Sequence, residues 1–252
     1  MVTRKSRREI EKMRIAGRIV AEVLALVESE LRPGVTTGYL DRIAERHIRS
    51  SGAVPSFKGY GHSSNPFPAS LCISIDSEVV HGIPGERVIR DGQIVSVDAG
   101  AIYDGWHGDA ARTFAVGEPS EKVRDLIDTT RLAMMAGIAA AVPGAHLSDI
   151  AAAIEDTARP HGYGIVRQFV GHGIGTEMHQ EPQVPNYRTG AKGLKLVPGI
   201  CLAIEPMLTL GSHEVVVAAD GWTVHTRDGS LAAHFEHSIA VTDKGPEILT
   251  TV

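Results

Sequence analysis

Apolar residues near the start of the chain follow a helical period. Between residues 10 and 31 they recur every three or four positions, at Ile10, Met13, Ala16, Val20, Val23, Val27 and Leu31. This spacing predicts an amphipathic helix that ends before Pro33-Gly34. A second helix is predicted over 37–51, closed by Gly52.

The chain repeats this plan further on. A helix is predicted from about residue 120 to Pro143-Gly144, and another helix reaches about Arg159 before Gly162. The two Pro-Gly pairs are 110 residues apart (143 − 33). A predicted strand follows each helix pair, at 91–100 and 198–207, and an offset of 107 (205 − 98) relates Asp98 to Glu205. Few residues are identical, so chance similarity is the alternative, but we predict two related halves, each placing a carboxylate at the end of one strand.

The other predicted strands are short runs bounded by Gly, Pro and Asp. They lie at 70–75, 110–116, 165–170, 214–218, 222–226 and 234–241. No Gly/Ser-rich or Pro-rich linker separates the two halves. We therefore expect residues 1–252 to form one domain.

Composition narrows the class of protein. A hydrophobic fraction of 43% with 22% charged residues is typical of a globular chain with a full core. The net charge of −5 argues against nucleic acid as a specific partner. Cys72 and Cys201 form no CxxC pair, and neither a secretory signal nor an apolar run of membrane-spanning length is present. We expect a cytoplasmic protein with no membrane segment.

Two aspartates suggest a hairpin. If paired residues sum to 207 (98 + 109), the turn lies near Tyr103–Gly105, and Asp98 and Asp109 face each other on neighbouring strands. Two ionised carboxylates held this closely repel unless they share a proton or a cation. The alternative is a pair of solvated acids beside a turn.

Further candidates lie in the second half. His172 and His179 fall within GHGIGTEMHQEP, seven residues apart, which is not a helical metal-binding spacing. A hydrogen-bonded structural role is the alternative for each histidine. Glu205 ends an apolar run before Pro206, and Glu236 lies inside the strand-like AHFEHSIAV. Buried carboxylates need partners, so these acids either bind metal or form salt bridges with some of the 25 Lys and Arg residues.

Four carboxylates and one imidazole would form an oxygen-rich metal site. Two divalent ions match four negative charges, and bridging carboxylates hold such a pair together. One nitrogen among oxygens suits Mn, Fe, Co or Zn. Water held between two such ions becomes hydroxide near neutral pH and attacks a carbonyl group. This pattern favours hydrolysis without a protein nucleophile.

The chain resembles the type I methionine aminopeptidases over essentially its whole length. The motifs that carry the resemblance are CISIDSEVVHGIPG (72–85), DGQIVSVDAGAIYDGWHGDAARTF (91–114), GHGIGTEMHQEPQV (171–184), PGICLAIEPM (198–207) and DGWTVHTRDGSLAAHFEHSIAVT (220–242). The resemblance implies an α+β pita-bread fold, with two pseudo-symmetric halves around a curved antiparallel sheet. It also implies two divalent metal ions (Co, Mn, Fe or Zn), held by Asp98, Asp109, His172, Glu205 and Glu236, with Asp109 and Glu236 bridging.

The resemblance assigns roles to three residues around the metal ions. Glu205 would carry a proton from the bridging water to the leaving amine, His179 would hydrogen-bond the scissile carbonyl, and His81 would contact the departing nitrogen. The activity implied is that of a hydrolase in protein maturation, which removes the initiator methionine from nascent chains when the second residue is small.

The substrate pocket departs from the family pattern. Cys72 and Trp222 match pocket positions, although Cys72 alone could be a small buried hydrophobic residue. Many members carry Tyr at the position of Phe67 and Phe at that of Met178. Because Met is more adaptable than Phe, the pocket wall is expected to be looser. The segment 58–70 is also longer than usual.

Two rival functions stay open. A proline-specific (Xaa-Pro) peptidase of the same fold usually carries an additional N-terminal domain and more histidines, for which the stretch before Asp98 leaves no room. A non-catalytic peptide-binding module would have lost its metal ligands, which are intact here. Only 33 residues (205 − 172) separate His172 from Glu205, without the large insertion of type II members, which favours type I.

The expected partners are nascent polypeptide N-termini, with the chain a monomer. The basic stretch Arg4, Lys5, Arg7 and Arg8 suggests transient contact with the ribosome. Glu9 and Glu11 dilute this charge, so a solvated helix face is the simpler interpretation.

Overall fold

The computed structural model describes residues 2–252. The helices are α1 (Arg7–Glu30), α2 (Thr37–Ser50), α3 (Glu121–Ala140), α4 (Leu147–Ala158) and the short η1 (Arg159–His161). The strands are β1 (Val54–Pro55), β2 (Leu71–Ile75), β3 (Glu78–Val80), β4 (Ile94–Tyr103), β5 (Trp106–Ala115), β6 (Gly164–Ile165), β7 (Gly171–Gly173), β8 (Gln180–Val184), β9 (Cys201–Ile204), β10 (Met207–Thr209), β11 (Val215–Val217), β12 (Val224–Thr226), β13 (Ala232–His234), β14 (Glu236–Thr242) and β15 (Gly245–Ile248). All four predicted helices are confirmed.

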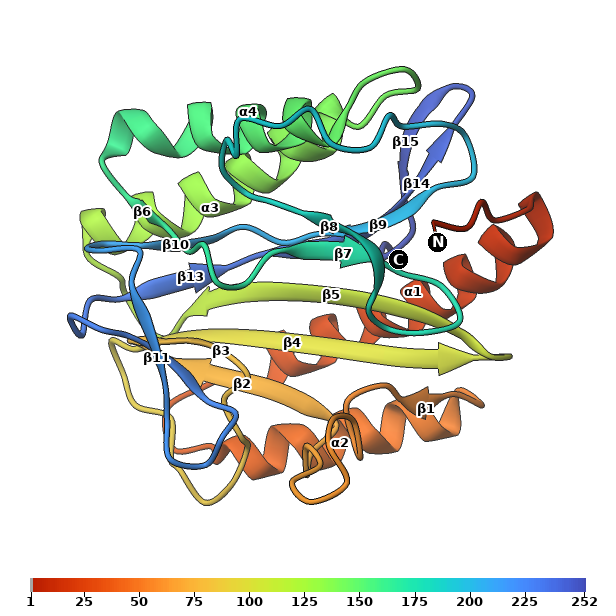
Figure 1. Ribbon diagram of the computed structural model, residues 1–252. Helices are drawn as coiled ribbons and strands as arrows, with labels where there is room; N and C mark the ends of the chain where they lie inside the picture. Colours follow the sequence, from red (N-terminus) through yellow and green to blue (C-terminus); the bar gives the residue numbers. More distant parts are fainter. Residues whose placement is uncertain (1) are drawn as a thin grey trace.

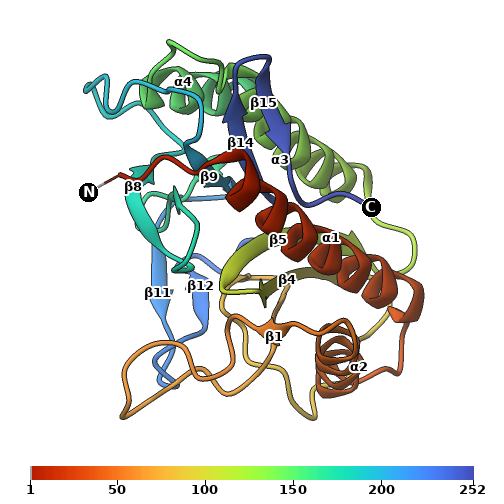
Figure 2. The ribbon, with the colours of Figure 1, turned by 90° about the vertical axis from the view of Figure 1, so that its right-hand side faces the viewer.

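A nine-stranded antiparallel sheet forms the centre of the molecule. Its main path runs β1-β4-β5-β14-β9-β7-β8, with β2 added to β4 and β15 to β14. The four long helices lie on one face of this sheet (Figures 1 and 2). The other face is therefore left to loops and short strands, and it carries the candidate site. No helix among residues 2–252 is long and apolar enough to cross a membrane.

The two predicted halves are present. One core cluster packs α1 and α2 against β2, β4 and β5, and another packs α3 and α4 against β9 and β14. Gly34 donates its N–H to the carbonyl of Ile89, and Gly144 makes the same bond to Leu196. The glycines are 110 residues apart (144 − 34) and their acceptors 107 (196 − 89), the offsets found in the sequence. Both glycines have φ of +93°, a left-handed conformation that glycine adopts readily.

Three predicted strands are wrong as continuous elements, because the chain leaves one sheet for another at each of them. Only Ile165 of 165–170, His234 of 234–241 and Met207 of 198–207 belong to a small sheet of order β13-β10-β6. Strands β9 and β14 belong to the large sheet, as does β7, which begins only at Gly171, after the predicted strand 165–170. The breaks after β9 and β13 fall at Glu205-Pro206 and Phe235. This bend between sheets brings residues 205, 234 and 236 together.

The N-terminal segment is packed rather than wholly solvated. Ser6 and Glu9 form a capping box that starts α1. Lys5 is only 7% exposed, and its ammonium group donates to Gln180 Oε1 at 3.2 Å. A solvated role is therefore wrong for Lys5, whereas Arg4 is exposed like its neighbours Arg7 and Arg8.

Candidate metal centre and adjoining pocket

Asp98 and Asp109 come from the long hairpin of β4 and β5. The register pairs Asp98 with Ala111 and Gly100 with Asp109, so paired numbers sum to 209 and the predicted direct opposition is wrong. The reason is the turn, where Asp104 and Gly105 both have positive φ and a two-residue loop joins Tyr103 to Trp106. A change of two in the sum keeps the parity, so both carboxylates still share one face as diagonal neighbours. Asp98 also lies in the middle of β4, not at its end as predicted.

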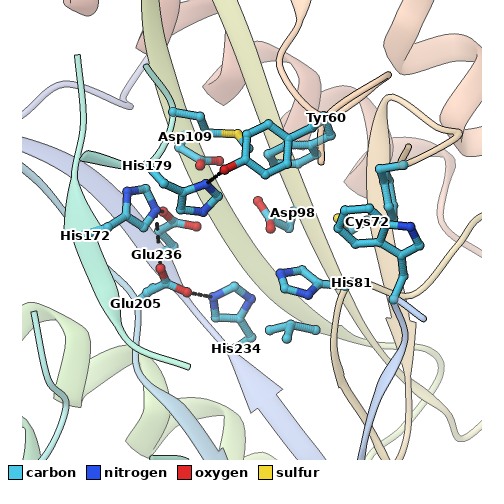
Figure 3. Close-up of a pocket in the computed structure, with 15 residues that line it drawn as sticks. Tyr60, Cys72, His81, Asp98, Asp109, His172, His179, Glu205, His234 and Glu236 are labelled. Carbon is cyan, nitrogen blue, oxygen red and sulfur yellow. Dashed lines mark hydrogen bonds and ion pairs between the residues drawn. The ribbon is translucent and has the colours of Figure 1, made fainter. Parts of the chain in front are cut away.

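The remaining candidate ligands come from the neighbouring strands in order. Glu236 opens β14 and pairs with Ala111 of β5, while Glu205 directly follows β9 as predicted. His172 lies on β7 and pairs with Ala203 of β9. Adjacent strands thus bring all five predicted ligands to one cavity, which Asp98, Asp109, His172, Glu205 and Glu236 line together (Figure 3).

Ligand atoms in this cavity gather in two groups that share one residue. Asp109, His172 and Glu236 each offer an atom within 4.8 Å of the others, and so do Glu205, His234 and Glu236. His172 Nε2 lies 3.5 Å from Glu205 Oε1 and 4.0 Å from Glu236 Oε1. Asp98 belongs to neither group but lines the same cavity.

The acids have no lysine or arginine partner in the described part of the chain. Within residues 2–252, no Lys or Arg forms a salt bridge with Asp98, Asp109, Glu205 or Glu236, so the alternative of structural ion pairs is wrong. Asp109 and Glu236 are 3% and 2% exposed. Asp98 Oδ1, Asp109 Oδ1 and Glu236 Oε1 are buried without any hydrogen-bond partner. Buried polar atoms usually have partners, and cations would satisfy these oxygens. The residues therefore fit divalent metal ions.

Burial also decides the protonation of the acids. Desolvation raises the pKa of Asp98 to about 7 and that of Glu205 to about 8. Desolvation and the neighbouring carboxylates raise the pKa of Asp109 and of Glu236 well above the usual range. Without cations, the cluster therefore holds protons at pH values where exposed acids are ionised.

The imidazoles around the cluster are neutral. Burial lowers the pKa of His172 to about 3 and that of His81 to about 4, and it lowers the pKa of His179 and His234 as well. A neutral ring keeps a lone pair for a metal ion or for an N–H donor. The Nδ1 atom of His172 lies 3.0 Å from the carbonyl of Gly173, which leaves Nε2 directed at the acids.

His81 reaches the cavity through an unusual backbone conformation. It follows β3 with φ of +60°, in the left-handed region. The next residue, Gly82, fixes the backbone after His81, because its N–H donates to Ser74 Oγ. Only glycine fits at position 82, since a Cβ there would lie 2.2 Å from the carbonyl oxygen of Ile73. The His81 ring stands edge-on to Phe169, at 5.5 Å between centroids. Such strain is concentrated at functional sites, which agrees with the predicted position of His81 beside the reacting groups.

His179 is held by a residue that sequence reasoning missed. The Tyr60 hydroxyl lies 2.7 Å from His179 Nδ1, and the rings of His179 and His172 are 4.2 Å apart. With the hydroxyl donating, His179 carries its proton on Nε2 and can donate it to a substrate. Tyr60 lies in a loop 119 residues before His179, and no spacing in the sequence could have revealed this contact.

His234 is the second functional candidate that sequence reasoning missed. It is 2% exposed and lines the cavity beside Glu205. The sequence did contain a signal for His234, because a residue two positions before Glu236 in an extended chain points to the same face as Glu236. His107 is also buried, with Nδ1 2.9 Å from Ser56 Oγ.

An apolar pocket adjoins the carboxylates. All four predicted pocket residues meet there, and the cluster consists of Phe57, Phe67, Ala69, Cys72 and Met178 with Ile83 and Trp222 against it. Phe67 and Trp222 pack edge to face at 5.3 Å. The segment 58–70 covers one side, where Trp222 Nε1 donates to the Asn65 carbonyl. Burial raises the pKa of the Cys72 thiol, which makes it a neutral part of the wall.

Comparisons with known proteins place this arrangement in a class. Metallopeptidase family M24 matches residues 11–243, and the chain belongs to this family of metal-dependent peptidases. The methionine aminopeptidase of Clostridium acetobutylicum is 53% identical over 99% of both chains. The structure of methionine aminopeptidase from Thermotoga maritima superposes with a TM-score of 0.96 at 43% identity, covering all of both chains. An Xaa-Pro dipeptidase from Bacillus anthracis reaches a TM-score of 0.79 at 26% identity, but the match covers only 62% of that chain. The predicted pita-bread fold is confirmed.

Metal binding is expected to release protons near neutral pH. The folded-state pKa values of these acids lie above their unfolded values, so their contribution to stability is full below about pH 4 and is lost as the pH rises through 7 to 8. Divalent ions then take the place of the protons. Calorimetric titration at pH 6.5, in two buffers of different ionisation enthalpy, should show protons released per ion bound.

The same linkage fixes the effect of metal on thermal unfolding. Because protons compete with the ions at low pH, added metal should raise the Tm more at pH 8 than at pH 5. A metal-induced rise that is equal at both pH values, together with no proton release, would contradict the assigned cluster.

Proposed function

We propose that this chain is a methionyl aminopeptidase that removes the initiator methionine from nascent proteins when the second residue is small. The observation that carries the proposal is the junction of the metal cluster with the apolar pocket. Cys72 of the pocket pairs with Asp98 across β2 and β4, so the thiol and the carboxylate share one face of the sheet. A substrate's first side chain and its amino group would therefore be bound side by side.

The pocket supports an exopeptidase. Phe67, Cys72 and Met178 are at most 5% exposed, so buried side chains would close the apolar end around the first side chain of a substrate. An unbranched, polarizable methionine side chain suits a wall of aromatic rings and sulfur. The α-ammonium group would lie at Asp98, where the carboxylates provide the opposite charge. A longer chain could not extend past this end.

The protein's own groups supply binding and proton transfer. Bound divalent ions would acidify a water molecule and polarise the scissile carbonyl, and the shared residue Glu236 supports two ions. Glu205 would accept the proton of the attacking water on a carboxylate oxygen and deliver it to the leaving nitrogen. His179 Nε2–H would donate to the carbonyl oxygen as negative charge develops there. The neutral His81 would accept a hydrogen bond from the departing N–H.

The second substrate residue would meet a constricted passage. His81, His179 and Val80 line both the pocket and a wider groove bounded by Phe169 and Gln183. The rest of the peptide would leave through this groove, with its second side chain between the two imidazoles. A second side chain placed between the two rings would favour a small residue.

Hydrolysis of short peptides tests the proposal. Met-Ala-Ser should be cleaved with a kcat/KM about 10–200-fold above that of Met-Leu-Ser, because the larger side chain clashes in the passage. N-acetyl-Met-Ala-Ser should resist cleavage, since it lacks the ammonium group. Glu205→Gln should keep the Tm and lose nearly all turnover. Faster hydrolysis of Xaa-Pro peptides would favour the proline-specific alternative, and a well-folded protein that never binds divalent ions would favour the binding module.

Tyr60→Phe should impair the transition state more than substrate binding. Loss of the bond to Nδ1 frees the His179 ring, so we expect kcat to fall about 10-fold with KM nearly unchanged, less than the 10²–10³ that loss of the donor itself costs. Steady-state kinetics on Met-Ala-Ser measures this, with His179→Ala as the more severe comparison. If Tyr60→Phe raised KM alone, Tyr60 would be only a pocket wall.

The proposed partners are nascent N-termini in the cytoplasm, met by a monomeric enzyme. The exposed Arg4, Arg7 and Arg8 support transient contact with ribosomal RNA through its phosphates. Replacing these three residues with Gln should reduce co-sedimentation with ribosomes at low salt and leave peptide hydrolysis intact. Unchanged co-sedimentation would remove this part of the proposal.

A further inference from the structure

We propose that His234 is a ligand of the metal centre, a second nitrogen donor that faces Glu205 from the side opposite to His172. This inference rests on the metal-dependent function proposed above, and it adds one residue to the five predicted ligands. Figure 3 shows the two rings on either side of the Glu205 carboxylate.

The geometry around Glu205 is nearly symmetrical. His172 Nε2 lies 3.5 Å from Oε1 and His234 Nε2 lies 3.5 Å from Oε2. An ordinary N–H···O bond spans about 2.7–3.2 Å, which is shorter than either separation. Two ligand atoms of one tetrahedral ion, each about 2.0–2.2 Å from it, are about 3.4 Å apart. Both separations therefore suit joint coordination of an ion better than a direct hydrogen bond.

The Nε2 atom of His234 is available for a metal ion. This nitrogen is buried and has no hydrogen-bond partner among residues 2–252. The backbone of His234 is fixed on both sides by Thr113, whose hydroxyl accepts from the His234 N–H and donates to its carbonyl, each at 2.8 Å. A ring held in place with a free buried nitrogen, next to two carboxylates, matches a preorganised ligand.

The two ligand groups then become chemically alike. Each contains one imidazole, with His172 in one and His234 in the other, and they share Glu236. With His234 as a ligand, each of the two ions would have one nitrogen donor, whereas the five predicted ligands give a nitrogen donor to one ion only. Nitrogen ligands favour Zn²⁺, Fe²⁺ and Co²⁺ over Mn²⁺ and Mg²⁺, which prefer oxygen. His234 would thus shift the metal preference of the centre toward the nitrogen-binding ions.

Nitrogen NMR tests the ligand directly on the wild-type protein. Metal-free protein with ¹⁵N-labelled histidine would be titrated with Zn²⁺ and followed by long-range ¹H–¹⁵N correlation. The Nε2 signals of both His172 and His234 should move to the range of metal-bound nitrogen by two equivalents. Movement of His172 alone would overturn the proposal.

Metal affinities of variants give an independent measurement. His234→Gln keeps a neutral group that can hydrogen-bond Glu205 but binds metal poorly. Mutation of a residue that only hydrogen-bonds a metal ligand typically weakens metal affinity by about 10–100-fold. Loss of a direct ligand should therefore weaken one Co²⁺ or Zn²⁺ site by about 100-fold or more. The Mn²⁺ affinity should fall much less. Equal losses for all ions, or none, would contradict a nitrogen ligand.

His237→Gln is the matched control. His237 is a largely buried histidine on the same strand as Glu236, and its Nδ1 bonds Thr250 Oγ1 at 2.7 Å instead of facing the acids. This variant should bind both ions like the wild type. Neither measurement requires peptide hydrolysis, so a protein that binds Zn²⁺ through His234 but cleaves no methionyl peptide would refute the proposed function and leave this inference intact.

Discussion

Four acidic side chains share one buried cavity without any lysine or arginine salt bridge among residues 2–252, and this electrostatic conflict is the constraint on which the structure depends. Such a cluster can be neutral through protons or through cations. Burial raises the pKa of all four acids, so bound protons neutralise the cluster while the metal is absent. The need for cations at this site thus follows from how the strands place these residues, because no lysine or arginine among residues 2–252 lines the cavity and burial keeps the surrounding imidazoles neutral.

The fold brings the four acids together by joining two similar halves along one pair of strands. Strand β5 of the first half pairs with β14 of the second, and the acids of both halves meet on the face that the helices leave free. Stability comes from the two cores on the helical side, across the sheet from the acids. The site can therefore carry unsatisfied polar atoms, since the apolar clusters beneath it supply the folding free energy.

The substrate side of the cavity is built differently. Its walls come from separate loops that carry Phe67, Met178 and Trp222. Side-chain contacts join them, such as the edge-to-face pair of Phe67 and Trp222 and the bond from Trp222 Nε1 to the Asn65 carbonyl. Specificity thus depends on side-chain packing in loops, whereas metal binding depends on strand register. This division would let substrate specificity change with the loops while the metal centre stays the same.

The sequence by itself determined the helices, the repeated halves and the choice of five candidate ligands that the structure brings to one cavity. Helical periods and Pro-Gly stops are local features, and the order of acids and histidine is covalent, so neither depends on long-range contacts. Even the hairpin of Asp98 and Asp109 was predicted with the right face, because a register error of two preserves the alternation of side chains.

Only the tertiary structure decided the rest. The bend between sheets splits runs that read as single strands at Glu205 and Phe235, since pairing partners elsewhere in the chain determine where a strand ends. Tyr60 reaches His179, and His234 faces Glu205, through contacts between segments that sequence distance does not connect. Burial of the acids, and hence their shifted pKa, likewise exists only once the two halves have closed around them.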